Sequence, residues 1–275
     1  MSQRGICSRR EADKLIEQGL VRVNGETVNT LGIKFPDTVE ISLTEKAKKI
    51  QQKRITIMIN KPVGYVSGQA EDDYIPAVRL IKHDSQSEFD KSNLSLQSEH
   101  FDGLAPAGRL DIDSQGLLVL TQDGRVAKQL IGADSDLEKE YLVRVDQLVS
   151  KQQLEQLTFG LELDGKALKR AKVQQINDQQ LQIILREGKK RQIRRMCEAV
   201  GLHVSGLKRV RVGELRLGKL AEGEWRYVDA TEFHHRTSQK SKNSRGGKSP
   251  QRDKNSHKKK SSQRKNSLYG AAKLK

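Results

Sequence analysis

Residues 108–121 read GRLDIDSQGLLVLT, so an acid-bearing turn leads directly into an apolar strand. A carboxylate held in such a turn, here that of Asp111, is a candidate nucleophile or general base. Two other segments supply partners for it, because residues 138–143 contain Tyr141 and residues 191–196 contain a cluster of arginines. An acid, a tyrosine and several arginines together indicate an enzyme that acts on RNA.

The elements that must position these groups have the patterns of a mixed α+β domain with many short strands. Strands are predicted at 55–60, 117–121, 141–145, 181–185, 204–212 and 225–228. Short helices are predicted at 125–131 and after Ser150. Residues 61–64, with their proline and glycine, are interpreted as a turn that ends the first strand, and the polar stretch at 68–103 gives no clear prediction.

Apolar residues recur at helical spacing through residues 190–200, and Gly201 is suited to end that helix. The apolar side of this helix, which includes Cys197, is expected in the core, so that its arginines project towards a cleft. Alternation of apolar and basic residues at 208–212 predicts a strand with its arginines on one face. The arginines of these two elements that are expected to contact RNA are Arg191, Arg195, Arg209 and Arg211.

The N-terminal 45 residues have the signals of a small separate module. Ser8 and Glu11 match a capping box for a helix that ends near Gly19, and Asn24 and Gly25 predict a hairpin turn. The basic residues of this module that are candidates for phosphate contacts are Arg9, Arg10, Lys14 and Arg22. A solvated charged face would account for the same four residues.

Charge and composition divide the remainder of the chain. Residues 46–54 are predicted to form a linker or a short exposed helix, and residues 55–233 the main domain. Residues 234–275 contain fourteen Lys and Arg against one acidic residue, so about 13 of the 16 net positive charges lie in this tail. The tail has few apolar residues and is expected to be disordered, adding salt-sensitive attraction to phosphates or serving only as a solubilising segment.

Several classes of protein do not fit this sequence. It has no apolar run long enough for a membrane span and no apolar signal-peptide core, so a cytoplasmic protein is expected. We also expect it to be a monomer. Cys7 and Cys197 have no paired ligands, which argues against a structural disulfide or a metal site. An aromatic content of 4% argues against recognition by rows of stacking side chains.

In these motifs the chain resembles the bacterial rRNA pseudouridine synthases of the RsuA type. The catalytic motif is matched at 108–118, the tyrosine motif at 139–141 and the arginine motif at 191–196. Residues 113–116, 138–143 and 191–198 are most similar to the RluF branch, which modifies large-subunit (23S) rRNA. The N-terminal module resembles the alpha-L RNA-binding module, although the family's opening helix is missing from this sequence, as a late start codon or a truncation would explain.

The resemblance implies a mixed, mostly antiparallel synthase domain that converts a uridine to pseudouridine without a cofactor. Asp111 would be the nucleophile, Tyr141 would stack on the extruded base and assist proton removal, and Arg194 would pair with Asp111 and lower its pKa. Arg109 would contact the target strand or fill the space left by the flipped base, whereas Asp113 is interpreted as a turn or surface residue. The expected partner is large-subunit rRNA or an assembly intermediate.

Other interpretations stay open from the sequence. Asp111 could be a turn acid, Tyr141 a core residue and the arginines a solvated face, in a catalytically silent RNA-binding or ribosome-assembly factor. A synthase of 16S rRNA or of a tRNA anticodon arm is a second alternative. A glycosidase is disfavoured, because its two carboxylates face each other across a sugar at roughly 5 to 9.5 Å and often work beside aromatic platforms.

Overall fold

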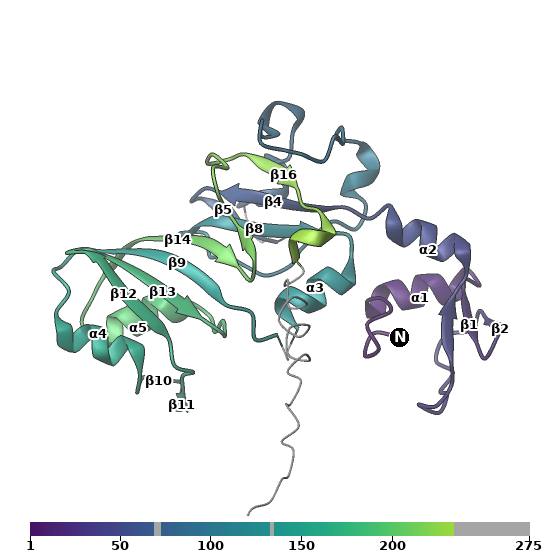
Figure 1. Ribbon diagram of the computed structural model, residues 1–275, viewed down its shortest axis with the longest axis horizontal. Helices are drawn as coiled ribbons and strands as arrows, with labels where there is room; N and C mark the ends of the chain where they lie inside the picture. Colours follow the sequence, from purple (N-terminus) through teal and green to yellow (C-terminus); the bar gives the residue numbers. More distant parts are fainter. Residues whose placement is uncertain (69–72, 133–134, 234–275) are drawn as a thin grey trace, which may run out of the picture. The chain divides into compact units, whose positions relative to one another are not determined.

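Residues 1–68, 73–132 and 135–233 are described by the computed structural model, whose chain course is drawn in Figure 1. They form the predicted mixed α+β fold, in which antiparallel pairing predominates. The tail from residue 234 onward, for which disorder is predicted, lies outside the described residues. No helix in the described part is both long and apolar enough to cross a membrane.

The N-terminal module begins with the helix that the capping box predicts. Ser8 Oγ accepts a hydrogen bond from the Glu11 N–H, and the Glu11 carboxylate accepts one from the Ser8 N–H, both at 3.2 Å. The predicted turn is also confirmed, since Asn24 and Gly25 have φ of 51° and 87°. The elements of the module are α1 (Arg9–Glu17), β1 (Val21–Val23), β2 (Glu26–Val28) and β3 (Ile41–Leu43). Its sheet has the order β2-β1-β3.

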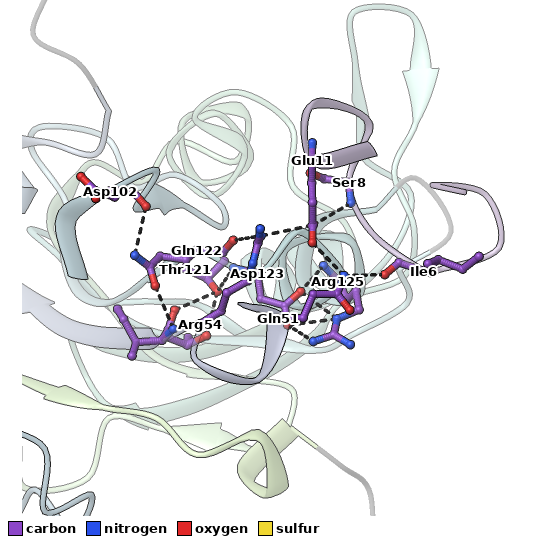
Figure 2. A network of polar contacts seen from close by, with 12 residues as sticks. Ile6, Ser8, Glu11, Gln51, Arg54, Asp102, Thr121, Gln122, Asp123 and Arg125 are labelled. Atoms are coloured by element: carbon purple, nitrogen blue, oxygen red, sulfur yellow. Dashed lines mark hydrogen bonds and ion pairs between the residues drawn. The ribbon is translucent and has the colours of Figure 1, made fainter. Parts of the chain in front are cut away.

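Residues 46–54 fall largely in helix α2 (Glu45–Gln52), one side of which is buried. Gln51 Nε2 donates to Glu11 Oε1 at 2.7 Å, and Arg54 Nη1 lies 3.2 Å from Glu11 Oε2. Arg54 also donates to the Gln122 carbonyl at 2.6 Å. Figure 2 shows this network, whose polar partners offset the cost of removing the Glu11 carboxylate from water.

One large sheet organises the remaining described chain. Its strands are β4 (Thr56–Lys61), β7 (Ala105–Pro106), β8 (Gln115–Thr121), β9 (Lys139–Val145), β12 (Lys172–Asn177), β13 (Gln180–Leu185), β14 (Val204–Val212), β15 (Leu215–Arg216) and β16 (Trp225–Tyr227). The spatial order is β12-β13-β9-β14-β8-β4-β16, with β15 beside β14 and β7 beside β8. Neighbouring strands are antiparallel except β14 and β8, which are parallel.

Helices cover parts of both faces of this sheet. They are α3 (Gly124–Ile131), α4 (Lys151–Thr158) and α5 (Gln192–Ala199). Leu157 of α4 and Met196 of α5 share a core with Tyr141 of β9, and Figure 1 shows both helices beside β12 and β13. Leu130 of α3 belongs to a second core with Met58 of β4. The predicted burial of Cys197 on α5 is confirmed, since its side chain is fully buried.

The stretch at 68–103, which gave no prediction, packs against the last strand of the sheet where it is described. It contains β6 (Ile75–Pro76), which pairs with β5 (Tyr65–Val66), and three short 3₁₀ helices. The indole of the fully buried Trp225 donates to the Lys82 carbonyl at 2.8 Å, and the Tyr227 N–H donates to Asp90 Oδ2 at 2.9 Å. Residues 82–90 therefore cover the outer edge of β16.

A β-bulge separates the two arginines that the alternation at 208–212 placed on one face. Arg209 lies opposite Tyr141, but Arg211 lies opposite Glu140, because the register of β14 against β9 shifts between them. Since Glu140 and Tyr141 are consecutive in a strand, their side chains point to opposite faces. The prediction of a shared face is therefore wrong.

On the same face of the sheet as Glu140, the carboxylate of Glu138 binds three basic side chains. It accepts hydrogen bonds from Lys172 at 2.6 Å, Arg211 at 3.1 Å and Arg186 at 3.3 Å. The hydrogen bond from Lys172 is the largest of the causes that lower the pKa of Glu138 to about 2. Arg211 also donates to Glu140 at 2.7 Å, so its guanidinium is occupied by two carboxylates.

Glu138→Gln is expected to remove part of the acid sensitivity of the fold. With a pKa of about 2 in the folded protein against an ordinary 4.5, the ionised Glu138 stabilises the fold fully above pH 4.5. This contribution declines as the pH falls from 4.5 towards 2. Urea unfolding at neutral pH and at about pH 3 should show a smaller acid-induced loss of stability in the variant than in the native protein. Equal losses would contradict the prediction.

Candidate active site

Asp111 lies in the turn between β7 and β8, and the backbone on either side of it is fixed. The buried Ser67 hydroxyl accepts a hydrogen bond from the Leu110 N–H at 2.8 Å and donates one to the Leu110 carbonyl at 2.7 Å. On the other side, the Gly64 N–H donates to the Ile112 carbonyl at 2.9 Å. The turn that ends β4 thus supports the turn that carries Asp111.

The Asp111 side chain itself is only partly buried. Its carboxylate forms no hydrogen bond or ion pair with any other residue in the described ranges. A carboxylate that is fixed through its backbone but has no committed partner is available to a bound substrate. This is the arrangement that nucleophilic or general base chemistry requires.

The arginines expected beside Asp111 bind Asp113 instead. Arg191 donates to the two carboxylate oxygens of Asp113 at 3.2 and 2.9 Å. Arg194 Nη2 donates to the Asp113 carbonyl at 2.8 Å, and its Nε lies 3.3 Å from the Asp113 carboxylate. The predicted ion pair between Arg194 and Asp111 is therefore wrong. Asp113 does lie in a turn with its side chain partly exposed, as predicted, but its contacts with the two arginines were not predicted.

Through its contacts with Arg191 and Arg194, Asp113 links helix α5 to the turn that carries Asp111. Burial tends to raise the pKa of Asp113, but the hydrogen bond from Arg191 and the charges of Arg191 and Arg194 outweigh it and hold the pKa below its usual range. Arg194 also donates to the Val204 carbonyl at 3.0 Å, so its guanidinium joins three elements. The position of Asp113 two residues after Asp111 was the sequence signal for a role in the site, but Asp113 was assigned no such role from the sequence.

Asp113→Asn is expected to lower kcat by about tenfold while leaving the fold intact. The variant loses the charge that orients Arg191 and Arg194, but Arg194 keeps its bonds to the two backbone carbonyls. Single-turnover rates with excess enzyme would measure the effect. Asp146→Asn is a matched control because the Asp146 side chain is exposed, and its carboxylate lies 3.8 Å from His203 Nε2. Equal rates for the two variants would contradict an orienting role.

Lys61 is a component of the site that sequence reasoning missed, since it was interpreted as part of a strand-ending turn. Its side chain is fully buried, and Nζ donates to the Pro62 carbonyl at 2.8 Å and the Tyr65 carbonyl at 2.9 Å. Burial lowers the pKa of Lys61 to about 8, although the charges of Asp113 and Asp111 oppose that shift. A lysine at the end of a strand with the apolar run Ile57, Met58 and Ile59 was the signal available in the sequence.

Tyr141 is 9% exposed and packs in the core beneath α4 and α5. It lies directly opposite Arg209 in the pairing of β9 with β14. The phenol hydroxyl has no hydrogen bond to another residue in the part of the chain that the structure describes. Packing thus fixes the position of the Tyr141 ring, while its hydroxyl is available to hydrogen-bond a substrate.

The arginines predicted to bind RNA fall into two groups. Arg109 and Arg191 are exposed close to the turn, and Arg195 is partly buried and forms an ion pair with Asp164 at 2.6 Å. Arg209 is only 5% exposed, and Arg211 is bound to Glu138 and Glu140. The second pair is therefore committed within the protein and does not form an open RNA surface. 

The basic residues of the module are on its surface. All four are exposed, namely Arg9, Arg10, Lys14 and Arg22. The first three line a groove whose other wall includes Gln97 and His100. Within the described ranges, no group of three or more His, Cys, Asp or Glu residues is arranged to hold a metal ion.

Comparison with protein families gives two matches. Residues 55–199 match the RNA pseudouridylate synthase family, and residues 1–35 match the S4 domain. The first match contains the turn with Asp111, Tyr141 and the arginines of α5. The second contains the capped helix and the hairpin of the module.

Individual relatives cover most of the chain. The chain is 36% identical over 228 residues to the dual-specificity RNA pseudouridine synthase RluF of Escherichia coli K12, covering 82% of this chain and 72% of the relative. It is 33% identical to the ribosomal large subunit pseudouridine synthase B of Bacillus subtilis, covering 81% and 87%.

A solved structure is also similar. The crystal structure of a pseudouridylate synthase aligns with a TM-score of 0.57 and 28% identity, covering 82% of this chain and 92% of that one. A family match over more than half of the sequence, relatives above 30% identity and this common fold lead to one conclusion. The chain belongs to the RNA pseudouridine synthase family.

Proposed function

We propose that this enzyme isomerises a specific uridine of 23S rRNA to pseudouridine, with Asp111 as the nucleophile. The observation that carries the residue assignment is the fixed turn, which presents the Asp111 carboxylate without a competing partner among the described residues. The name of the Bacillus subtilis relative, a ribosomal large subunit synthase, supports the choice of RNA. The Escherichia coli relative is named a dual-specificity RNA synthase, so 16S rRNA and a tRNA anticodon arm are the alternative substrates to examine.

The reaction breaks the bond between uracil N1 and the ribose C1′ and forms a new bond between C5 and C1′. The proton on C5 leaves and N1 gains one, so no redox step is involved. Asp111 attacks the ribose or the base covalently, or assists elimination at the ribose. The released base then rotates within the site and re-adds through C5.

The neighbouring groups support this chemistry. Tyr141 stacks on the extruded base, and its uncommitted hydroxyl assists removal of the C5 proton. Arg194, held by two carbonyls and by Asp113, stabilises negative charge that develops beside the turn. The buried ammonium of Lys61 adds positive potential beneath the same turn.

We further propose a division of labour along the chain. Residues 1–45 bind RNA through Arg9, Arg10 and Lys14, and residues 55–233 carry out the isomerisation. Extruding a base from its stack costs a few kcal/mol, and phosphate contacts by the module, by Arg109 and by other basic groups supply that free energy.

The test is to map pseudouridines in total RNA from cells with and without this protein. Carbodiimide labelling followed by reverse transcription marks each pseudouridine as a stop. The expected result is one stop in 23S rRNA that disappears on deletion and returns on complementation with the native chain. A stop that changes in 16S rRNA or tRNA instead would overturn the choice of RNA, and no change in any RNA would favour a silent RNA-binding factor.

A further inference from the structure

Arg209 is a buried cation without an acidic partner. Its side chain is 5% exposed, and it forms no ion pair with any residue in the described ranges. Burying a guanidinium without a carboxylate is costly, so its remaining contacts must compensate. Arg211 and Arg226, which are more exposed than Arg209, do have carboxylate partners.

The contacts of Arg209 are carbonyl oxygens that bracket the turn carrying Asp111. Its Nη1 donates to the Arg109 carbonyl at 3.2 Å, and its Nε donates to the Leu117 carbonyl at 2.8 Å. Arg109 comes two residues before Asp111, and Leu117 is in the strand that follows the turn. One rigid guanidinium thus fixes both ends of the turn relative to each other.

The strand that carries Arg209 is itself fixed at the same point. Arg209 lies opposite Gly116 where β14 and β8 pair in parallel, and Lys61 lies opposite Gly116 from the other side on β4. Arg209 also lies opposite Tyr141 on β9. Its main chain therefore meets the strand that follows the turn, and its side chain reaches back over the turn itself.

We propose that Arg209 is a positioning residue for the isomerisation. It holds the turn so that the Asp111 carboxylate meets the ribose or base at the correct distance. Its charge adds to that of Lys61, whose pKa it helps to lower. Because this inference rests on the proposed role of Asp111, its test must separate the two.

Arg209→Met removes both hydrogen bonds and the charge while keeping an unbranched side chain as far as the position of Nε. A displacement of about 1 Å in a reacting group costs about a hundredfold in rate, so kcat should fall by about that factor. KM and the Kd for RNA should change by less than about twofold, because the side chain does not reach the surface. Arg209→Lys restores the charge and one hydrogen bond, and it should recover about tenfold of the lost rate.

The matched control is Arg226→Met, which removes a half-buried arginine that binds Glu232 and the Tyr227 carbonyl. It should lose thermal stability while keeping kcat within about twofold of the native value. All rates are measured by single-turnover conversion at a temperature at which circular dichroism shows each variant folded.

The outcomes are distinct. A raised KM with unchanged kcat in Arg209→Met would overturn the inference and make Arg209 an RNA contact. A fall in kcat that Arg226→Met reproduces at equal stability would make its role merely structural and would also overturn it. If Asp111→Asn retains turnover, the proposed role of Asp111 as the nucleophile is wrong. If Asp111→Asn is inactive and Arg209→Met is fully active, only the positioning role of Arg209 is wrong.

Discussion

Asp111→Asn is expected to abolish turnover, lowering the single-turnover rate by at least about 10⁴-fold, while the Kd for RNA stays within about twofold. An amide cannot serve as the nucleophile, and the backbone bonds that fix the turn do not involve the Asp111 side chain. The fold should therefore be unaffected. Because the C5 hydrogen is lost in the reaction, tritium release from RNA labelled at C5 measures turnover directly.

The control for this experiment is Asp146→Asn, which removes one exposed carboxylate outside the site. It should keep the native rate and the native Kd. Asp111→Ala should be as inactive as Asp111→Asn. The alanine variant is included because deamidation of the introduced asparagine would slowly regenerate the aspartate, whereas alanine cannot revert. Turnover within about tenfold of the native rate in Asp111→Ala would remove Asp111 from the reaction.

Gly116→Ala is expected to cause the largest loss of stability from a single methyl group. Gly116 has φ of +105°, and an added Cβ would lie 2.8 Å from the backbone nitrogen of Arg209 and closer still to its carbonyl oxygen. Backbone atoms of a paired strand cannot move aside as a flexible side chain can. Strain at a glycine-only φ and separation of β14 from β8 should together cost about 4 kcal/mol or more.

Urea unfolding monitored by circular dichroism would measure this loss. Gly218→Ala is the matched control, because Gly218 also has a positive φ, +59°, but nothing lies within 4 Å of its added Cβ. It should cost only about 1 kcal/mol, the strain of the backbone conformation alone. If the two variants lose the same free energy of unfolding, the close approach of β8 and β14 does not limit the size of this residue.

Local sequence signals predicted those parts of the fold that depend on residues close together in the sequence. The two reciprocal hydrogen bonds of the capping box join residues three apart, and the turn at Asn24 and Gly25 depends on the positive φ that these two residue types adopt readily, so both signals are readable without the rest of the chain. Residues 82–90 are different, since their hydrogen bonds go to Trp225 and Tyr227, far along the chain. No periodicity within such a segment records a distant partner.

The same limit applies to the site. Motifs identified the three segments that the structure brings together, but they did not show which arginine meets which acid. That choice depends on how the turn presents Asp113, rather than Asp111, to α5. Similarly, the shared face predicted for Arg209 and Arg211 failed because a bulge, which sequence alternation does not reveal, inserts one residue between them.

The parallel pairing of β8 with β14 has a consequence for how the enzyme folds. It rests on two residue pairs, Gln115 with Lys208 and Gly116 with Arg209, and it joins segments far apart in the sequence. Strands β9, β12 and β13 pair with nearer neighbours, so their loops close at lower entropic cost and earlier. The turn with Asp111 is completed only when the distant strands meet, so catalytic competence should be among the last properties that a newly made chain acquires.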